Sequence, residues 1–386
     1  MRQITLALLS FVCLSILVED ASAIPAFARK YGYSCNVCHS PAPKLKPYGD
    51  EFARNGFQIT GQEPPRFVQA TGDVDLLLMR ELPVAMRFEL YATYASKSST
   101  SVDMESPLLL KFLSGGQIAK DVAYYFYFFF SERGSVAGIE DAFIMFNNIA
   151  NVDLDFYLGQ YQLSDPLFKR ELRLELQDYR IYSTNVGASN ANLTYDRGVM
   201  VTYKAPTGTD LALEVLNGNG IGAPIGEAFD VDKYKNYLLR ASQEIIPAFR
   251  LGAFAYTGKE KPVAISNEFL MFGPDFTVNV DKFQLNVQYV ARTDNNPDFL
   301  FAAPSSKVKT DGGFAELIFS PDYDKSKWYG TLLYNKVNSD YPGVEYQSFT
   351  GNFTYLIATN LRLTGEYTYE TTSKISSVAV GFFSAF

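Results

Sequence analysis

Apolar and polar side chains alternate from about residue 83 to the last residue, and this alternation limits the possible folds more than any other part of the sequence. In residues 360–371 the alternation separates two sets, with Leu361, Leu363, Tyr367 and Tyr369 on one face and Arg362, Thr364, Glu366, Thr368 and Glu370 on the other. Residues 152–158 and 283–289 repeat this design. A period of two with one apolar and one strongly polar face is typical of a half-buried β-strand. The alternation therefore predicts an all-β structure over residues 83–386.

Two all-β architectures alternate in this way, a soluble sandwich or propeller and a membrane barrel. Polar side chains such as Gln284, Asn286 and Gln288 would stay unpaired in one dry core, which costs free energy, whereas a water-filled lumen hydrates them. The 31 Phe and 26 Tyr residues suit the aromatic girdles of a barrel in lipid. The terminal Phe386 also resembles an outer-membrane assembly signal. We therefore predict a transmembrane antiparallel β-barrel in the bacterial outer membrane, in contact with membrane lipid.

We expect about sixteen strands, because bacterial outer-membrane barrels have an even strand number. They are predicted near residues 84–96, 105–115, 120–131, 138–148, 151–162, 193–204, 208–216, 234–246, 248–258, 266–278, 280–293, 311–320, 326–337, 346–357, 360–371 and 375–386. Turn signals at 205–208, 321–322 and 340–343 separate several of them.

One segment, residues 163–192, breaks this rhythm. Its first half has mixed helical and strand periodicity, and a connection of this length inside a compact fold is usually functional or disordered. The apolar side chains of Phe168, Leu172, Leu174 and Leu176 argue against disorder. Two placements stay open, a loop folded into the barrel lumen and a cap outside the barrel.

Residues 1–23 have the pattern of a secretory signal peptide. Arg2 supplies the positive charge, residues 4–18 form the apolar core, and residues 21–23 form a small-residue cleavage site. The apolar core is too short to span a membrane, which takes about 20 residues. We therefore predict export, with a mature chain that begins at Ile24. The chain is modestly acidic, with 34 Lys and Arg against 42 Asp and Glu, which argues against a nucleic-acid partner.

Residues 35–39 read CNVCH, and His39 is the single histidine of the sequence. A C-x-x-C-H run is the attachment signature of a c-type haem, in which two thiols bond the haem and the imidazole becomes an axial iron ligand. The alternatives are a zinc site and a redox dithiol. Zinc needs about four ligands, and the remaining cysteine, Cys13, lies in the export signal. A thioredoxin-like redox site needs a surrounding βαβ pattern, and no such pattern follows the motif in this sequence. We therefore predict one covalent haem c on Cys35 and Cys38, with His39 as axial ligand.

Residues 24–82 are predicted to form a small haem-binding plug segment and a linker, followed by the barrel of residues 83–386. Within this segment, apolar residues recur at a spacing close to that of a helix, at Leu45, Tyr48, Phe52 and Phe57. This spacing predicts a short amphipathic helix that lies against the porphyrin. So short a segment buries too little surface to fold alone. We therefore expect a larger scaffold to pack around it.

The sixth ligand of the haem iron cannot be a second histidine, because the chain has none. Methionine is a frequent alternative that raises the reduction potential. Met200 falls on the polar, lumen face of its predicted strand, and Met79 lies in the linker before the first strand, whereas Met86 should face lipid. We predict Met200 or Met79 as the sixth ligand. Simple packing is the alternative for each, and Lys44 and Lys46 are further candidates.

The N-terminal motifs resemble those of the fused monohaem cytochrome c–porin family, which includes outer-membrane iron oxidases. The resemblance rests on the sequence PAFARKYGYSCNVCH at residues 25–39 and on three shorter matches at residues 43–45, 48–49 and 52–57. The sequence SDPLFKR at residues 164–170 is also similar to members of this family. The resemblance is specific in sequence over residues 24–60, whereas over the barrel it is a similarity of architecture. The resemblance implies a haem plug in or at a barrel mouth that passes electrons across the outer membrane. It also implies that Cys35, Cys38 and His39 form the haem site.

These features predict an electron-transfer protein that connects an extracellular donor, with Fe(II) as one candidate, to a periplasmic cytochrome or other carrier. Activity as an iron(II):cytochrome oxidoreductase and a non-enzymatic carrier role both stay open. The rival hypothesis is a diffusion porin whose haem plug is structural or sensory. Carboxylates in the lumen would attract a cationic donor, with simple lumen polarity as the alternative for each. The candidates are Asp153, Asp155, Asp196, Glu366 and Glu370.

Overall fold

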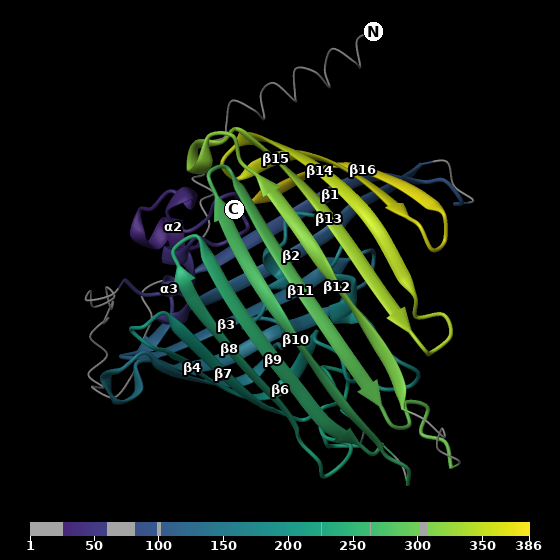
Figure 1. Cartoon of the computed structure of the whole chain (residues 1–386). Coiled ribbons are helices and arrows are strands. Elements are labelled where there is room, and N and C mark those ends of the chain that lie inside the picture. Colours follow the sequence, from purple (N-terminus) through teal and green to yellow (C-terminus); the bar gives the residue numbers. More distant parts are fainter. Residues whose placement is uncertain (1–25, 60–81, 99–101, 225, 263, 302–306) are drawn as a thin grey trace, which may run out of the picture.

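The computed structural model describes residues 26–59, 82–98, 102–224, 226–262, 264–301 and 307–386. Sixteen antiparallel strands form one closed barrel, in which each strand pairs with its neighbours in sequence and β1 pairs with β16 (Figure 1). Closure satisfies the backbone hydrogen bonds of every strand and leaves no free sheet edge. The predicted fold class is therefore confirmed. The predicted signal peptide and Met79 lie outside the described residues.

The strands are β1 (Val84–Ala95), β2 (Asp103–Ala119), β3 (Val122–Glu132), β4 (Gly138–Phe146), β5 (Leu154–Gln162), β6 (Tyr195–Lys204), β7 (Thr209–Leu216), β8 (Asn236–Ile246), β9 (Phe249–Glu260), β10 (Asn267–Val280), β11 (Phe283–Asp294), β12 (Val308–Phe319), β13 (Trp328–Ser339), β14 (Tyr346–Ala358), β15 (Leu361–Glu370) and β16 (Ile375–Ala385). Strand β2 runs beyond its expected end at residue 115. Strand β5 begins later than expected, because residues 149–151 form the short helix η2 (Ile149–Asn151).

The two faces of each strand match the alternation of its side chains. On β15, Arg362, Thr364 and Glu366 are buried in the lumen, whereas Leu363 and Tyr367 are exposed on the outside. Buried polar side chains of neighbouring strands bond one another. The amide of Asn352 on β14 donates to Thr364 and Glu366, each at 3.1 Å. Hydrogen bonding of this kind is what makes a polar interior stable.

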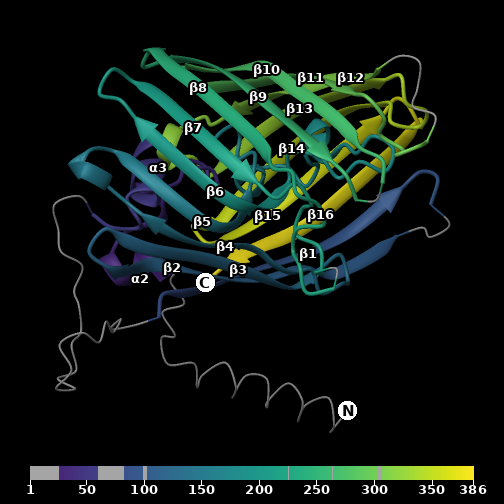
Figure 2. The ribbon, with the colours of Figure 1, turned by 90° about the horizontal axis from the view of Figure 1, so that it is seen from below.

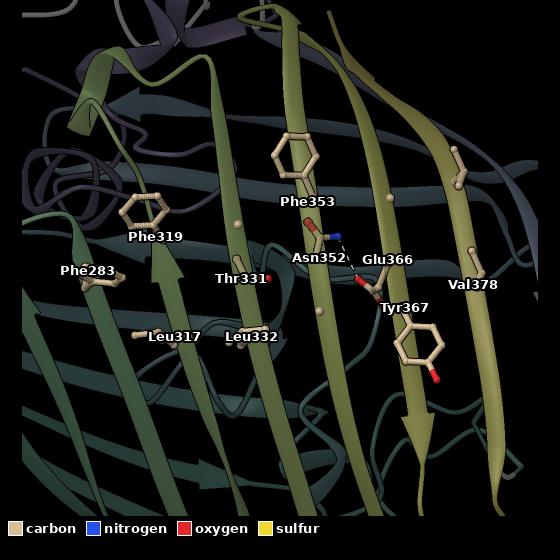
Figure 3. Close-up of a pocket in the computed structure, with 14 residues that line it drawn as sticks. Phe283, Leu317, Phe319, Thr331, Leu332, Asn352, Phe353, Glu366, Tyr367 and Val378 are labelled. Atoms are coloured by element: carbon tan, nitrogen blue, oxygen red, sulfur yellow. Dashed lines mark hydrogen bonds between the residues drawn. The ribbon is translucent and has the colours of Figure 1, made fainter.

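The outer surface of β11–β16 is apolar and carries a shallow groove of about 530 Å³. Figure 3 shows that Phe319, Phe353 and Tyr367 lie around it, while the hydrogen-bonded pair of Asn352 and Glu366 lies behind the strands. The single tryptophan of the chain, Trp328, packs against Phe319 and Phe353 at centroid distances of 5.6 and 5.4 Å. A barrel with an apolar, aromatic exterior is built to face lipid.

The two ends of the barrel differ in their connections. One end carries short connections, among them residues 120–121, 205–208, 247–248, 281–282 and 359–360, and it also holds the start of β1 and the end of β16. We call it the short-turn end. The other end carries the two longest connections, 163–194 and 217–235. In outer-membrane barrels the short turns face the periplasm.

The described residues before the barrel form two short helices and one helical turn at the short-turn end (Figures 1 and 2). These are α2 (Ala26–Tyr31), η1 (Cys35–Val37) and α3 (Pro47–Arg54). Helix α3 is the predicted amphipathic helix. Pro47 suits its first turn, and Arg54 in its last turn complements the helix dipole. Three more helical turns lie in connections, η3 (Arg170–Leu172), η4 (Arg180–Ser183) and η5 (Tyr323–Lys325). No helix in the described part of the chain is long and apolar enough to cross a membrane.

Candidate functional site in the barrel mouth

Residues 26–59, which we call the plug, pack against the inner wall through aromatic side chains. Phe57 stacks on Phe27 at a centroid distance of 4.7 Å and on Tyr125 of β3 at 5.3 Å. Phe52 meets both Phe27 and Tyr31 edge to face, each at 5.5 Å. Phe52 and Phe57 are buried. Aromatic burial of this extent fixes the plug to one side of the mouth.

Polar contacts at the end of α3 hold the plug to the short-turn end of the wall on the same side. Arg54 forms ion pairs with Asp153 at 3.6 Å and Asp210 at 3.4 Å. Asn148 donates to the side chain of Asn55 at 2.9 Å. Asp153 was expected on the lumen wall, and this prediction is wrong. Because β5 begins at Leu154, Asp153 belongs to a short turn and pairs with the plug instead.

Other contacts reach the opposite side of the mouth. Asn36 donates to the backbone carbonyl of Asp324 at 3.2 Å, and Lys46 pairs with the Asp324 carboxylate, in the connection between β12 and β13. Arg362, near the start of β15, donates to the backbone carbonyl of Ala42. The strand order places β12–β15 and β3–β5 on different sides of the ring. The plug therefore extends across the mouth from wall to wall.

The candidate haem ligands occupy one tight turn of the plug. The backbone N–H of His39 donates to the carbonyl of Cys35 at 2.9 Å, which closes the turn that η1 begins. Cys35 and Cys38 are free thiols. The imidazole Nδ1 of His39 lies 2.7 Å from the carbonyl oxygen of Pro43. Because a carbonyl only accepts, Nδ1 carries the proton and Nε2 carries the lone pair, as in imidazoles that bind a metal.

The surroundings keep these groups in a form that suits a haem. Burial lowers the pKa of His39, so the imidazole is neutral at neutral pH. Burial also raises the pKa of the Cys35 and Cys38 thiols. Gly49 of α3 lies so close to the carbonyl of Cys38 that a side chain there would overlap it. Two unpaired thiols and a neutral imidazole with a fixed tautomer fit the donor set of a c-type haem.

The two candidates for a sixth ligand have different outcomes. Met200 is 5% exposed and faces the lumen from β6, as its phase predicted. It belongs to the apolar cluster that includes Phe52 and Phe57 of the plug, and its role as a ligand stays a prediction. Met79 lies outside the described residues. Lys44, a further candidate, is half-buried near Glu316, and desolvation lowers its pKa to about 8.

Residues 163–194, between β5 and β6, fold into the lumen, which decides between the two placements left open by the sequence. We call this segment the lumen loop (Figure 2). The N–H groups of Leu176 and Gln177 donate to Glu366 on β15 at 2.7 and 2.9 Å. Tyr179 donates to Glu316 on β12 at 2.7 Å, and its ring stacks on Phe314 at 3.9 Å. The loop is therefore bonded to the wall opposite its own strands.

A cavity of about 310 Å³ lies between the lumen loop, the plug and the wall. Its lining includes Pro43 of the plug, Arg173 and Glu175 of the lumen loop, Arg87 of β1 and Arg362 of β15. This cavity could not be predicted from the sequence, because it combines segments that are far apart in the chain. The one feature of the sequence that pointed to this cavity was the alternation on β15, which places Arg362 and Glu366 on the inner face of the barrel.

Three of the four remaining candidate carboxylates have structural partners. Asp155 accepts a hydrogen bond from the backbone N–H of Asn148 at 3.0 Å. Asp196 accepts one from the N–H of Gly218 at 2.7 Å. Glu366 holds the lumen loop, and Glu370 lies half-buried at the far end of β15. These contacts favour simple lumen polarity over attraction of a cationic donor.

The solved structures with similar folds are bacterial porins. The anion-selective porin of Comamonas acidovorans matches with a TM-score of 0.57 and 11% identity, over 79% of this chain and 99% of that one. OmpT of Vibrio cholerae in its trimer form matches with a TM-score of 0.56 and 11% identity, over 79% and 99%. OmpF of Salmonella typhi in complex with daunomycin matches with a TM-score of 0.54 and 10% identity, over 79% and 97%. No protein-family model and no curated protein sequence matches the chain. The chain has the porin fold, and its lipid-facing exterior agrees with a place in the bacterial outer membrane.

Proposed function

We propose that this chain is an electron-transfer cytochrome of the outer membrane, with one haem c bonded to Cys35 and Cys38 in the mouth of a porin-fold barrel. The observation that carries the proposal is the position of the C-x-x-C-H motif. It lies in a plug that crosses the short-turn end, next to a cavity that continues into the lumen. A carrier at that position is accessible from the periplasm and lies on the path through the barrel.

Each part of the plug has a task in this proposal. The Cys35 and Cys38 thiols hold the haem, and His39 supplies an imidazole whose orientation is fixed by Pro43. When bound, the haem supplies reversible one-electron transfer. The aromatic contacts of Phe57 keep the plug on the wall, which sets the distance to a docked partner. The partners we propose are a periplasmic cytochrome or similar carrier on one side and an extracellular reductant, with Fe(II) as the first candidate, on the other.

A redox titration of the purified full-length protein, followed by visible spectroscopy, tests this proposal. We expect a c-type pyridine haemochrome, haem mass retained after denaturation, and reduction of the ferric protein by ferrous ion. The matched control is the double variant C35S/C38S, which should carry no covalent haem. Haem that acid acetone extracts from the wild type would contradict the proposal. So would covalent haem that neither ferrous ion nor a periplasmic cytochrome reduces or oxidises.

The second candidate is a diffusion porin in which the haem plug is structural or sensory. The fold match favours it, because the similar solved structures are porins. Single-channel conductance separates the two candidates. If electron transfer is the role, the plug and the lumen loop should keep the conductance of the wild type low. A large, stable open channel in the wild type would favour the diffusion porin.

A further inference from the structure

Arg362 is a buried arginine without a carboxylate partner among the described residues. Three arginines in the described part of the chain are buried, Arg240, Arg292 and Arg362. Arg240 pairs with Asp275 at 2.5 Å and Arg292 pairs with Asp294 at 2.6 Å. No ion pair joins Arg362 to any described residue, although it is only 5% exposed. Taking a charge out of water without a partner is costly. An anion at this position would offset that cost.

The contacts of Arg362 leave part of its guanidinium group free. Nη1 donates to the carbonyl of Ala42 and to the hydroxyl of Tyr329, the latter at 3.2 Å. The guanidinium carbon lies 4.0 Å from the centroid of the Phe383 ring. Nε is buried and has no hydrogen-bond partner in the structure. A planar guanidinium with open donors suits the two oxygens of a carboxylate or phosphate.

A comparison with the neighbouring Arg87 shows that the charge of Arg362 lacks a compensating carboxylate in the described part of the chain. Arg87 also lies over Phe383, at 4.6 Å, but its charge is compensated by Glu89, with an Nε to Oε1 distance of 2.6 Å. Arg362 lines the cavity that also includes Pro43, whose carbonyl orients His39. The unpaired charge therefore lies where the haem motif meets the lumen.

We propose that Arg362 binds an oxyanion at the boundary between the plug and the lumen, and that the resident anion is a propionate carboxylate of the haem. This inference rests on the proposed function. Arg362 then acts as a positioning residue, since it fixes the polar edge of the cofactor from the barrel wall. A free oxyanion such as inorganic phosphate shares this chemistry, and the experiment distinguishes the two sources.

The test compares R362Q and R362K with R133Q in the full-length, haem-loaded protein. Arg133 is exposed and lines the long-loop side of the same cavity, so R133Q removes one positive charge without touching the plug. We expect R362Q to lower the midpoint potential, because losing a positive charge beside the propionate favours the ferric state. The propionate bending band in resonance Raman should shift as well. R362K should restore the potential and leave the band partly shifted, and R133Q should change neither.

Each outcome supports or overturns the assignment. Covalent haem whose potential and propionate band are the same in R362Q and wild type would overturn the propionate assignment. A wild type without covalent haem would instead refute the proposed function. The anion site is then tested in C35S/C38S, where inorganic phosphate should raise the unfolding temperature only if Arg362 is present. Equal stabilisation of C35S/C38S and of its R362Q derivative would overturn the site itself. Folding of each variant is checked by circular dichroism.

Discussion

Asp178 illustrates how one side chain fixes the lumen loop. Its two carboxylate oxygens share the Nε–H of Arg170, each at 3.1 Å from Nε, and Oδ1 also accepts a hydrogen bond from the backbone N–H of Tyr179 at 2.8 Å. Burial alone would raise the pKa of Asp178, but the charges of Arg173 and Arg170 outweigh burial and hold this pKa below its usual range. The ionised carboxylate therefore stabilises the folded loop.

The variant D178N should loosen the lumen loop while the barrel stays closed. It removes the charge that holds two guanidinium groups, and hydrogen bonds to charged groups contribute about 1.5–3 kcal/mol. Because Asp178 is partly exposed, we expect a loss near the lower end of that range. Hydrogen exchange of residues 163–194 measures it. The control is D322N, an exposed aspartate in a short connection, which should leave exchange unchanged.

The same side chain predicts a dependence of the loop on acid. A carboxyl whose pKa is lower in the folded state adds stability above its unfolded pKa of about 3.9, and this stability is lost as the pH falls through the folded value. The protection of lumen-loop amides against hydrogen exchange should therefore decrease in the wild type below about pH 4. The D178N variant should lack this part of the acid sensitivity. Equal acid sensitivity of the two proteins would contradict the role given to Asp178.

Among the elements, the plug and the barrel are separate units joined by an aromatic interface and by polar contacts such as the ion pair of Arg54 with Asp210. The barrel is closed by its own backbone hydrogen bonds, whereas the plug depends on the stack of Phe27, Phe57 and Tyr125. Loss of a buried phenylalanine costs about 3–5 kcal/mol. The plug should therefore detach before the barrel unfolds.

The variant F57A tests this separation. We expect protease to cut within residues 26–59 of F57A while the barrel keeps its compact, heat-modifiable band in electrophoresis. The control F272A truncates an aromatic on the outer face of β10 and should leave the plug protected. A plug that resists protease in F57A as it does in wild type would show that the polar contacts suffice.

Helix α3 and the C-x-x-C-H turn are also coupled, through Gly49. An added methyl group there would overlap the carbonyl of Cys38, so G49A should push α3 away from the turn and lower the yield of the proposed covalent haem several-fold. The control is G365A on β15, where no atom lies within 4 Å of an added Cβ. Pyridine haemochrome per mole of purified protein measures the yield. Full haem content in G49A would mean that the turn tolerates the displacement.

For the protein as a whole, the barrel could be predicted well from the sequence because alternation is a local pattern. It identified the strands, the inward phase of Arg362 and Met200, and the outward phase of Tyr367. It placed Asp153 wrongly, since the strand begins three residues later than expected, at Leu154 instead of residue 151, which moves the side chain from the wall into a turn. The contact of Arg362 with Ala42 and the position of the lumen loop depend on packing between distant segments, which alternation does not encode.

The placement in the outer membrane is checked by fractionation. A closed barrel with an apolar exterior should be recovered with the outer membrane and show a strand-rich circular dichroism spectrum. Its apparent mass in electrophoresis should change on heating, because the barrel resists detergent until it unfolds. Recovery in the soluble periplasmic fraction would contradict a lipid-facing exterior.

We propose that the haem in the mouth passes electrons across the membrane, and electron transfer into sealed vesicles is the measurement that tests this role. Full-length protein is reconstituted into liposomes that contain trapped soluble cytochrome c, and dithionite is added outside. We predict rapid reduction of the trapped cytochrome with the wild type and only the background rate with C35S/C38S, whose barrel is otherwise intact. Equal reduction with both proteins would show leakage of the reductant through a pore. Background rates with both proteins would show that the haem does not carry electrons, and either result would contradict the proposed role of the haem.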